Sequence, residues 1–290
     1  MPEGPEVEVI RRELALHLPG RRINALTFGE KQLRQQSTQQ ELTSLAIGHC
    51  IEKLSRRGKY LLFHLDQGAT LLIHLGMSGS LLLFEPPIPT LPHGHLSIHL
   101  DDGRALVFQD TRRFGQFLIY PPGVKPLPLA AVGLEPFSRH LTPERLLTLT
   151  QGRQRPIKNF LLDGRIIAGI GNIYASEILF AAGLHPQTPV GELTHADWQI
   201  LIKAIRHILR AAIRLGGTTI SDFKNSQGEI GRFYPQLKVY GRAGEPCPRC
   251  GTPIERLVQA GRSSFFCPGC QARPNPDFKA RRGILNDQKS

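Results

Sequence analysis

Long apolar runs are absent from this sequence. No stretch approaches the roughly 18 consecutive apolar residues that a membrane-spanning helix needs. The first residues carry acidic side chains, whereas a secretory signal peptide begins with basic ones. We therefore expect no membrane partner and a cytoplasmic protein, acting at the nucleoid in a bacterial host. The hydrophobic content of 40% and the charged content of 21% are typical of globular domains.

Acidic residues are scarce relative to basic ones. The chain has 24 Asp and Glu residues against 36 Lys and Arg residues, which gives a formal net charge of +12. A surplus of this size favours a polyanionic partner, because Lys and Arg neutralise phosphates and release counterions. A membrane surface is the rival, but no long basic amphipathic helix supports it. Composition therefore favours nucleic acid as the partner.

Cysteine is also sparse, with five residues, and four of them are clustered. Cys247 and Cys250 form one Cys-x-x-Cys pair, and Cys267 and Cys270 form another, with sixteen residues between the pairs. In a cytoplasmic protein this spacing predicts a four-thiolate zinc site and not disulfides. Four thiolates fill the tetrahedral coordination of zinc, so we expect one structural Zn2+. The residues between the pairs predict a hairpin with Arg262 at its turn, where it either contacts a phosphate or is a solvated surface residue.

The spacing of apolar residues changes twice along the chain. Residues 5–18 carry apolar side chains at helical spacing, up to a Pro-Gly pair. Short apolar runs separated by turn clusters then predict a β-sandwich up to Tyr120. From Thr142, a cap followed by Pro143, the spacing is helical again. The predicted strands are 51–54, 60–65, 70–75, 80–84, 95–100, 105–108 and 116–120, and the later helices, after the one that starts at Pro143, are 156–162, 172–182 and 195–215.

These patterns predict an α+β protein with several parts. A chain of 290 residues is long enough for two separate cores. Residues 218–234 are polar and contain Gly, which predicts a long loop of the kind that is usually either functional or disordered. The expected domains are an N-terminal β-sandwich with a flanking helix (1–120), a linker (121–141), a helical domain with the long loop (142–239), a zinc module (240–271) and a polar, basic, disordered tail (272–290).

The N-terminus can carry covalent chemistry. A Met before a small residue such as Pro2 is commonly removed, which leaves a secondary amine at the start of the chain. A free α-amine has a pKa of about 7.7–8.0, so part of it is nucleophilic at neutral pH and can form an iminium with an aldehyde-like sugar carbon. Glu3 and Glu6 are then candidate proton donors. The alternative is an ordinary helix with Pro5 in an acidic first turn.

Several loops present charged or large side chains. Arg56-Arg57-Gly58-Lys59 lies between two predicted strands and offers Lys59 as a phosphate ligand or an acid–base group. Met77 lies on a Gly-flanked loop after His74, and Arg112 and Phe114 lie at another strand end. Together Met77, Arg112 and Phe114 can fill the gap that a flipped base leaves in a duplex. Taken singly, each fits better as an ordinary core or surface residue.

A glycine-rich turn precedes the predicted helix 172–182. Its glycines let a phosphate approach the backbone at a helix N-terminus, and Asn172 can add a side-chain donor. Glycine before a helix is common, so the motif alone is weak. Arg153, Arg155 and Lys158 just upstream increase its weight because they add positive charge.

Together these motifs resemble the formamidopyrimidine-DNA glycosylase family, from Pro2 to Cys270. The shared motifs, in chain order, are the Pro-Glu start, Arg56-Arg57-Gly58-Lys59, His74-Leu-Gly-Met77-Ser-Gly, Arg112-Arg113-Phe114-Gly115, Gly171-Asn172-Ile-Tyr-Ala-Ser-Glu, Val239-Tyr-Gly-Arg and the cysteine pairs. Seven motifs in order are far more specific than any one of them. They favour the catalytic interpretation of the N-terminus.

The resemblance implies a bifunctional base-excision repair enzyme, a monomer that acts on double-stranded DNA containing oxidised bases or abasic sites. Its helical domain would be a helix–two-turn–helix domain that carries the zinc-finger hairpin. Pro2 would attack C1′ of the damaged nucleotide, and Glu3, supported by Glu6, would donate a proton. Lys59 would serve in β-elimination and Arg262 in δ-elimination. The residues expected to contact DNA are His74, His93, Arg112, Arg153 and Asn172, and those expected to fill the void are Met77, Arg112 and Phe114.

Two alternatives to the oxidised-purine branch stay open. Gly4 replaces the Leu usual in that branch, and a Pro-Glu-Gly-Pro-Glu start is typical of endonuclease VIII-like enzymes for oxidised pyrimidines. The loop 76–79, the long loop 218–234, which would close over the extruded purine, and the Val239 motif match the purine branch, which we favour. The second alternative is a non-catalytic zinc-containing DNA-binding protein, although intact Pro2, Glu3 and Lys59 argue against it.

Overall fold

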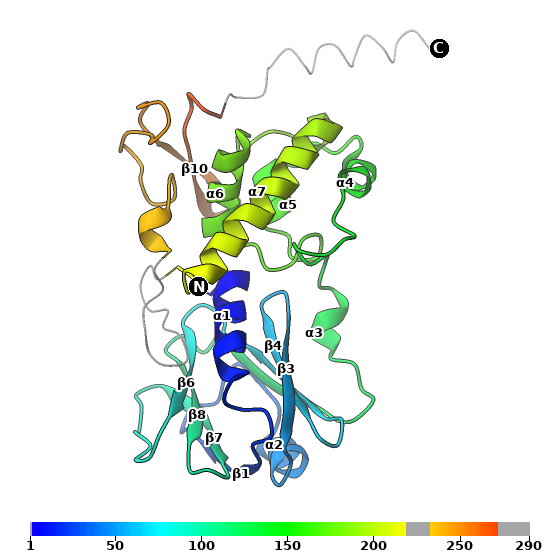
Figure 1. Ribbon diagram of the computed structural model, residues 1–290, viewed down its shortest axis with the longest axis vertical. Helices are drawn as coiled ribbons and strands as arrows, with labels where there is room; N and C mark the ends of the chain where they lie inside the picture. Colours follow the sequence, from blue (N-terminus) through cyan, green and yellow to red (C-terminus); the bar gives the residue numbers. More distant parts are fainter. Residues whose placement is uncertain (1, 219–232, 272–290) are drawn as a thin grey trace. The chain divides into compact units, whose positions relative to one another are not determined.

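The computed structural model describes residues 2–218 and 233–271 and contains two compact units (Figure 1). Unit 1 comprises Met1–Glu135, Ile167–Gly169 and Leu209–Gln236, and unit 2 comprises Pro136–Ile166, Ile170–Ile208 and Leu237–Ser290. None of the helices in the described ranges has the length and apolar character that a bilayer-spanning segment requires.

Unit 1 is built on a β-sandwich. One sheet has the strand order β1-β7-β8-β6 and is antiparallel throughout, while the other has the order β2-β9-β5-β4-β3, with a parallel β2–β9 pair. The strands are β1 (Ile23–Phe28), β2 (Gln35–Gln36), β3 (Ile51–Arg57), β4 (Tyr60–Leu65), β5 (Thr70–His74), β6 (Gly79–Phe84), β7 (Gly94–Leu100), β8 (Ala105–Asp110) and β9 (Gln116–Tyr120). The helices described in this unit are α1 (Gly4–Leu14), α2 (Gln39–Ala46), α3 (Leu127–Ala130) and the 3-10 turn η2 (Tyr234–Gln236), besides the end of α7, which is given below.

The sandwich core includes one face of α1. Val7, Ile10 and Leu14 recur at helical spacing and are buried in the same cluster as Phe63 of β4 and Phe108 of β8. The helix packs on β3 and β4, so β4 buries three residues in succession where a one-sided strand would alternate. The N-terminus is thereby held on the sandwich.

Unit 2 is mainly helical and carries a β-hairpin. Its elements are α4 (Pro143–Thr150), α5 (Ile157–Leu161), α6 (Asn172–Ala182), the 3-10 turn η1 (Val190–Glu192), the hairpin strands β10 (Glu255–Gln259) and β11 (Arg262–Phe266), and most of α7 (His195–Arg214). The helix α6 is buried from Ile173 to Phe180 and packs on both α5 and β11. Trp198 of α7 is fully buried against Phe160 of α5, with ring centroids 5.5 Å apart.

The hairpin turn places Arg262 at the start of β11. Gln259 pairs with Arg262, so the loop has only two residues, Ala260 and Gly261, with φ angles of 47° and 73°. Two positive φ angles in a two-residue loop are the pattern of a type I′ turn, whose twist matches that of paired strands.

The predicted α+β class, the β-sandwich and the zinc-module hairpin are confirmed. The pattern of strands and helices also agrees, and the helix Asn172–Ala182 matches at both ends. Three elements were missed, β1, β2 and α2, in a region expected to contain strands alone. The helix α2 begins with a capping box of Thr38 and Glu41, a signal that is present in the sequence.

Other predictions have not been tested. The five domain boundaries stay predictions, although α3 lies within the expected linker. Residues 219–232, which form most of the expected long loop, and residues 272–290, the expected tail, lie outside the described ranges.

Candidate active site and nucleic-acid interface

A buried carboxylate anchors the N-terminal segment in unit 1. Glu3 is the N-cap of α1 and is extended. Glu6, fully buried, accepts the backbone N–H of Glu3 and that of Thr218, each at 2.8 Å. Pro2 and Glu3 are also buried. Glu6 therefore supports the backbone beside Pro2, and Glu3 is the adjacent candidate for a proton donor.

Close backbone contacts bring the N-terminal segment to the turn before Lys59. The N–H of Gly4 donates to the carbonyl oxygen of Gly169 at 2.8 Å, and a Cβ on Gly4 would lie only 3.0 Å from that oxygen. A Cβ on Gly169 would lie 3.4 Å from the Cα of Gly4 and 3.7 Å from the carbonyl oxygen of Gly58. The unusual Gly4 thus permits a close approach that a side chain would push apart by a few tenths of an ångström.

An ion-pair network holds the turn that carries Lys59. Arg56 donates to Glu8 of α1 at 3.1 Å, to Glu135 at 2.9 Å and to the carbonyl oxygen of Gly58 at 2.7 Å. The N–H of Gly58 donates to Glu135 at 2.6 Å. Both backbone polar groups of the residue before Lys59 are therefore bound to charged side chains. Lys59 itself is half-buried.

Glu8 stays ionised within this network. Burial raises the pKa of its carboxyl, but hydrogen bonds from Arg11, Arg12 and Arg56 outweigh burial and lower the pKa to about 2. Glu8 is therefore a carboxylate at any pH at which the protein works, and it links α1 to β3.

His74, at the end of β5, is neutral at physiological pH. Burial, aided by the positive charge of Lys59, lowers the pKa of His74 to about 4. Its Nδ1 accepts the backbone N–H of Gly76 at 3.0 Å, so the proton of the neutral ring lies on Nε2. The ring lies 4.9 Å from that of Tyr60. His74 is therefore an uncharged, oriented hydrogen-bond donor.

Asp110 braces the two loops of the predicted void-filling residues. It is fully buried, and one oxygen accepts the hydroxyl of Ser78 at 2.5 Å and the N–H of Arg112 at 3.2 Å. The other oxygen accepts the N–H of Gly115 at 2.7 Å. A Cβ on Gly76 would lie 2.5 Å from the backbone of Phe114, so the two loops also touch directly. Asp110 was not among the residues predicted from the sequence to be functional.

The three void-filling candidates differ in exposure. Met77 is 43% exposed and Arg112 is exposed, whereas Phe114 is half-buried. Two guanidinium groups contact the Phe114 ring, with the Cζ of Arg34 4.1 Å and that of Arg112 4.9 Å from the ring centroid. The trio gathers on the loops that Asp110 braces.

His93 is exposed before β7 and has a φ of 62°, a backbone conformation that is uncommon outside glycine. Its carbonyl oxygen accepts the N–H of Asp110 at 3.0 Å, which places it beside the same loops. The neighbouring His95 is buried, with its ring nitrogens 2.6 Å and 2.7 Å from the carbonyl oxygens of Lys31 and Asp110.

In unit 2, a buried lysine joins the hairpin to the helices. Lys158 of α5 donates to the carbonyl oxygen of Ser263 at 2.7 Å and to the hydroxyl of Ser264 at 2.8 Å. The amide nitrogen of Asn172 donates to the same carbonyl oxygen at 3.0 Å. The exposed Arg262 directly precedes Ser263, so Lys158 and Asn172 fix its backbone. From the sequence, Lys158 was expected only to add positive charge, because spacing gives no signal for a contact across 105 positions.

Arg153 lies exposed on the loop after α4. Its carbonyl oxygen accepts the N–H of Gly191 at 3.0 Å, and no hydrogen bond of its side chain occurs within the described ranges. Arg155 differs, because it pairs with Asp163 at 3.0 Å and donates to the carbonyl of Asn159. Of these two arginines, Arg153 is the one whose charge is free for a phosphate.

The four cysteines come together as a candidate metal centre. Their Sγ atoms all lie within 4.8 Å of one another, with distances of 3.4 Å, 3.5 Å and 3.9 Å for three of the pairs. Tetrahedral zinc with bonds of about 2.3 Å needs sulfurs about 3.8 Å apart, so the set fits zinc. Hydrogen bonds with Thr252 lower the pKa of Cys250 to about 6, which favours the metal-binding thiolate.

Glu177 of α6 positions the segment that leads into the zinc module. Its buried carboxylate accepts the backbone N–H groups of Lys238, Val239 and Tyr240, each at 2.9 Å. Burial raises the pKa of Glu177, opposed by these hydrogen bonds. The shared motifs ending in Glu177 and beginning at Val239 are therefore one structural feature.

Family models match three parts of the chain. Residues 1–117 match the formamidopyrimidine-DNA glycosylase N-terminal domain, residues 132–224 its H2TH domain, and residues 244–273 a zinc finger found in FPG and IleRS.

Individual relatives are similar over nearly the whole chain. The formamidopyrimidine-DNA glycosylase of Chloroflexus aggregans is 46% identical over 272 residues, which cover 93% of this chain and 98% of that protein. Crystal structures of Lactococcus lactis Fpg are 33% identical, with TM-scores of 0.86 to 0.87, and cover 93 to 94% of this chain and 100% of theirs. Those structures contain DNA with an abasic site, an oxidised pyrimidine or N7-benzyl-Fapy-dG.

Proposed function

This chain belongs to the formamidopyrimidine-DNA glycosylase family, and we propose that it excises oxidised purines from duplex DNA and then cleaves the abasic site by β,δ-elimination. The observation that carries the proposal is the anchored N-terminus. Glu6 binds the N–H of Glu3 and so holds Pro2 and Glu3 in a buried position. A pre-oriented nucleophile beside a proton donor is what an iminium mechanism needs.

Base release uses Pro2 and Glu3. After removal of Met1, the lone pair of the Pro2 nitrogen attacks C1′ of the flipped nucleotide, and the bond from C1′ to the base breaks. The departing base takes up the proton that the Pro2 amine gives up. Glu3 supplies the proton that the opening sugar requires, and the product is an iminium between Pro2 and C1′. Glu6 acts through the backbone and does not touch the substrate.

Strand cleavage follows from the iminium. The positive nitrogen acidifies the proton on C2′, and its removal expels the 3′ phosphate in β-elimination. A second elimination expels the 5′ phosphate and leaves a gap of one nucleotide. We assign Lys59 to the first step and Arg262 to the second. The hydrogen bonds to Gly58 support the assignment of Lys59, because they hold the turn before it. The bonds of Lys158 and Asn172 to Ser263 support the assignment of Arg262, because they hold the residue after it.

The DNA partner is proposed from charge and from loop geometry. Neutral His74 offers Nε2–H to a phosphate oxygen, while Arg112, Arg153, His93 and Asn172 supply further contacts. Met77, Arg112 and Phe114 lie on loops braced by Asp110 and can enter the gap left by the extruded base. We propose a cytoplasmic monomer that binds damaged duplex in this way.

The metal is proposed to be one structural Zn2+ held by Cys247, Cys250, Cys267 and Cys270. Four thiolates saturate it, so it supplies folding energy to the hairpin of Arg262 and no open position for a substrate.

Oxidised pyrimidines are the second candidate substrate. Gly4 favours them, and Lactococcus lactis Fpg has been crystallised with an oxidised pyrimidine as well as with a Fapy lesion. A direct comparison of excision rates on the two kinds of lesion decides between the purine and the pyrimidine branch of the family. We expect excision of 8-oxoguanine opposite C to be at least about tenfold faster than excision of thymine glycol opposite A, a difference of roughly 1.4 kcal/mol. The reverse order assigns the chain to the pyrimidine branch.

The covalent step is tested by trapping. Borohydride added during reaction with abasic DNA should yield a protein–DNA adduct whose cross-linked peptide begins at Pro2. Pro2 is not the nucleophile if the adduct maps to Lys59, or if the purified protein retains Met1 and forms no adduct.

Glu3→Gln should bind damaged duplex and lose base excision, because the variant lacks the proton donor. Base excision retained by this variant would exclude Glu3 as the essential acid.

A further inference from the structure

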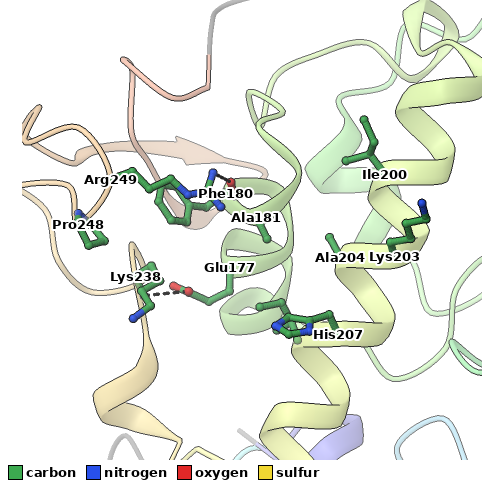
Figure 2. A pocket seen from close by; sticks show the side chains of 11 residues that line it. Glu177, Phe180, Ala181, Ile200, Lys203, Ala204, His207, Lys238, Pro248 and Arg249 are labelled. Carbon is green, nitrogen blue, oxygen red and sulfur yellow. Dashed lines mark hydrogen bonds between the residues drawn. The ribbon is translucent and has the colours of Figure 1, made fainter.

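A cavity in unit 2 is lined by none of the residues assigned to DNA, catalysis or metal. It has a volume of about 720 Å3 and lies on the second half of α6, away from Asn172. Figure 2 shows α7 on one side of this part of α6 and the zinc-module loop on the other. The volume is in the range of pockets that enclose small organic ligands, about 300–1,000 Å3.

The walls of the cavity combine apolar surface with cations. Helix α6 contributes the buried Phe180 and the half-buried Ala181, while Ile200 and Ala204 line the side of α7. Ile200 and Ala204 are four residues apart and share one face of α7, and Ile200 is 49% exposed. The apolar surface can therefore hold a flat or branched hydrocarbon body.

Positive charge in the lining exceeds negative charge. Lys203 of α7 is exposed on one side, and Lys238 and Arg249 are exposed on the other. Within the described ranges, no ion pair of these three cations occurs. Glu177 is the one carboxylate in the lining, and its oxygens already accept three backbone N–H groups. An anionic ligand would therefore meet these cations without having to displace a carboxylate from them.

One cation is already oriented. The guanidinium of Arg249 lies 4.3 Å from the centroid of Phe180 and donates to the carbonyl oxygen of Phe180 at 3.1 Å. Arg249 lies between Cys247 and Cys250, so this bond fixes the loop of the zinc module against α6. The loop between Cys247 and Cys250 therefore forms one wall of the cavity.

We propose that this cavity binds a small organic anion with an aromatic or branched apolar body, at a site separate from the DNA surface. Its apolar part contacts Phe180, Ala181 and Ala204, and its anionic group is attracted by the cations that flank the cavity. A bound ligand joins α6, α7 and the zinc module, and it stabilises their arrangement by its affinity for the folded form.

The test uses the full-length zinc-loaded protein and two fluorescent probes. Anilinonaphthalene sulfonate is the anionic probe, and N-phenylnaphthylamine is its neutral counterpart. We expect one saturable site for the sulfonate and at least about tenfold weaker binding of the neutral probe. Equal affinities would overturn the proposal, because the cations then have no role.

Variants locate the site. Lys203→Glu combined with Lys238→Gln should weaken sulfonate binding at least about tenfold, and Ala181→Trp should abolish it by filling the cavity. Lys125→Glu, an exposed charge change in unit 1, is the matched control and should bind normally. Retained excision of damaged DNA verifies that each variant is folded. Unchanged sulfonate affinity in folded cavity variants would place the probe elsewhere and overturn the proposal.

A competition experiment separates the cavity from the DNA surface. Saturating undamaged duplex should leave the bound sulfonate in place. Displacement of the probe by duplex, together with lower duplex affinity of the Lys203 and Lys238 variant, would make these residues phosphate contacts and overturn the proposal.

Discussion

At the scale of single residues, three buried carboxylates have the same role. Glu6 accepts the N–H of Thr218, Asp110 that of Gly115, and Glu177 that of Val239. Each holds a loop or segment next to a candidate functional residue. A carboxylate suits this task because it has two oxygens and accepts several N–H groups without donating.

Asp110→Asn tests this role at the void-filling loops. The amide keeps one acceptor oxygen, so its NH2 group faces a backbone donor, and we expect a loss of about 1–3 kcal/mol in the free energy of unfolding. Affinity for abasic duplex should fall as the loops of Met77 and Arg112 loosen. Denaturant titration and duplex binding measure the two effects.

The matched control is Asp102→Asn, on the exposed turn between β7 and β8, where Asp102 pairs with Arg104. This variant should lose less than about 1 kcal/mol and bind duplex normally. If Asp110→Asn is less stable but binds duplex with normal affinity, Asp110 stabilises the fold and has no role in DNA binding.

His74 predicts a pH dependence of stability. Its pKa is lowered from 6.5 to about 4 on folding, so the unfolded chain binds a proton that the folded protein does not. Stability is therefore complete above about pH 6.5 and falls as pH decreases towards 4. His74→Gln should make this loss shallower, as measured by denaturant titration between pH 7 and pH 4. His140→Gln, an exposed control, should keep the wild-type slope; the same slope in His74→Gln would show that the ring is solvated.

At the scale of elements, the turn between β3 and β4 is the most strongly constrained part of the candidate active site. Arg56→Gln removes the bond to the carbonyl oxygen of Gly58 as well as the bonds to Glu8 and Glu135. We expect the β-elimination rate to fall about 10- to 100-fold, because a displacement of about 1 Å is enough for such a loss. Base excision should decrease less, because Pro2 and Glu3 lie on another segment.

Single-turnover rates on abasic and 8-oxoguanine duplexes separate these steps. Arg11→Gln is the matched control, since Arg11 binds the same Glu8 but does not reach the turn. Equal losses of excision and elimination in Arg56→Gln would indicate general unfolding and not displacement of Lys59.

The zinc module is the second element, and its folding is expected to depend on the bound metal. A segment of about thirty residues cannot fold by burial alone, so metal binding and folding should be coupled. Cys250→Ser or removal of zinc should lower duplex affinity and slow δ-elimination through Arg262. The sandwich of unit 1 should stay folded, because its core is separate.

Circular dichroism, duplex affinity and product analysis on stripped and zinc-restored protein measure these effects. Cys50→Ser is the control, since Cys50 lies in unit 1 and outside the cysteine cluster. If the stripped protein still cleaves abasic DNA with the normal product ratio, the module does not position Arg262.

At the scale of the whole molecule, the net charge of +12 makes DNA binding depend on salt. The logarithm of affinity should fall linearly with the logarithm of salt concentration, with a slope of about −0.9 for each neutralised phosphate. Arg153→Gln should make the slope shallower by about 0.9, because its guanidinium is exposed.

Arg155→Gln is the control for the salt slope. Arg155 pairs with Asp163, so the change should affect stability and leave the slope unchanged. Fluorescence anisotropy at several salt concentrations measures the salt slope of duplex affinity for both variants. Equal slopes for wild type and Arg153→Gln would exclude Arg153 as a phosphate contact.

The fold and the site differed in how far they could be predicted. Apolar spacing located the other strands and the helix Asn172–Ala182, but it missed β1, β2 and α2, although Thr38 and Glu41 form a capping box at α2. The candidate residues Pro2, Lys59 and Arg262 came from motifs. The residues that hold them, Arg56 with Glu135 and Lys158 with Ser263, have no sequence pattern, because each pair is 79 or 105 positions apart.

Properties that depend on residue identity and short spacing follow from the chain alone: the positive charge, the paired cysteines with metal-ligand spacing, the apolar faces and the family motifs. Properties that depend on the path of the chain do not. The bond from Glu6 to Thr218 spans 212 positions, the neutral state of His74 requires its burial near Lys59, and the cavity on α6 needs the metal-binding loop against Phe180. Burial and long-range hydrogen bonds arise only when the folded chain brings distant segments together and excludes water between them.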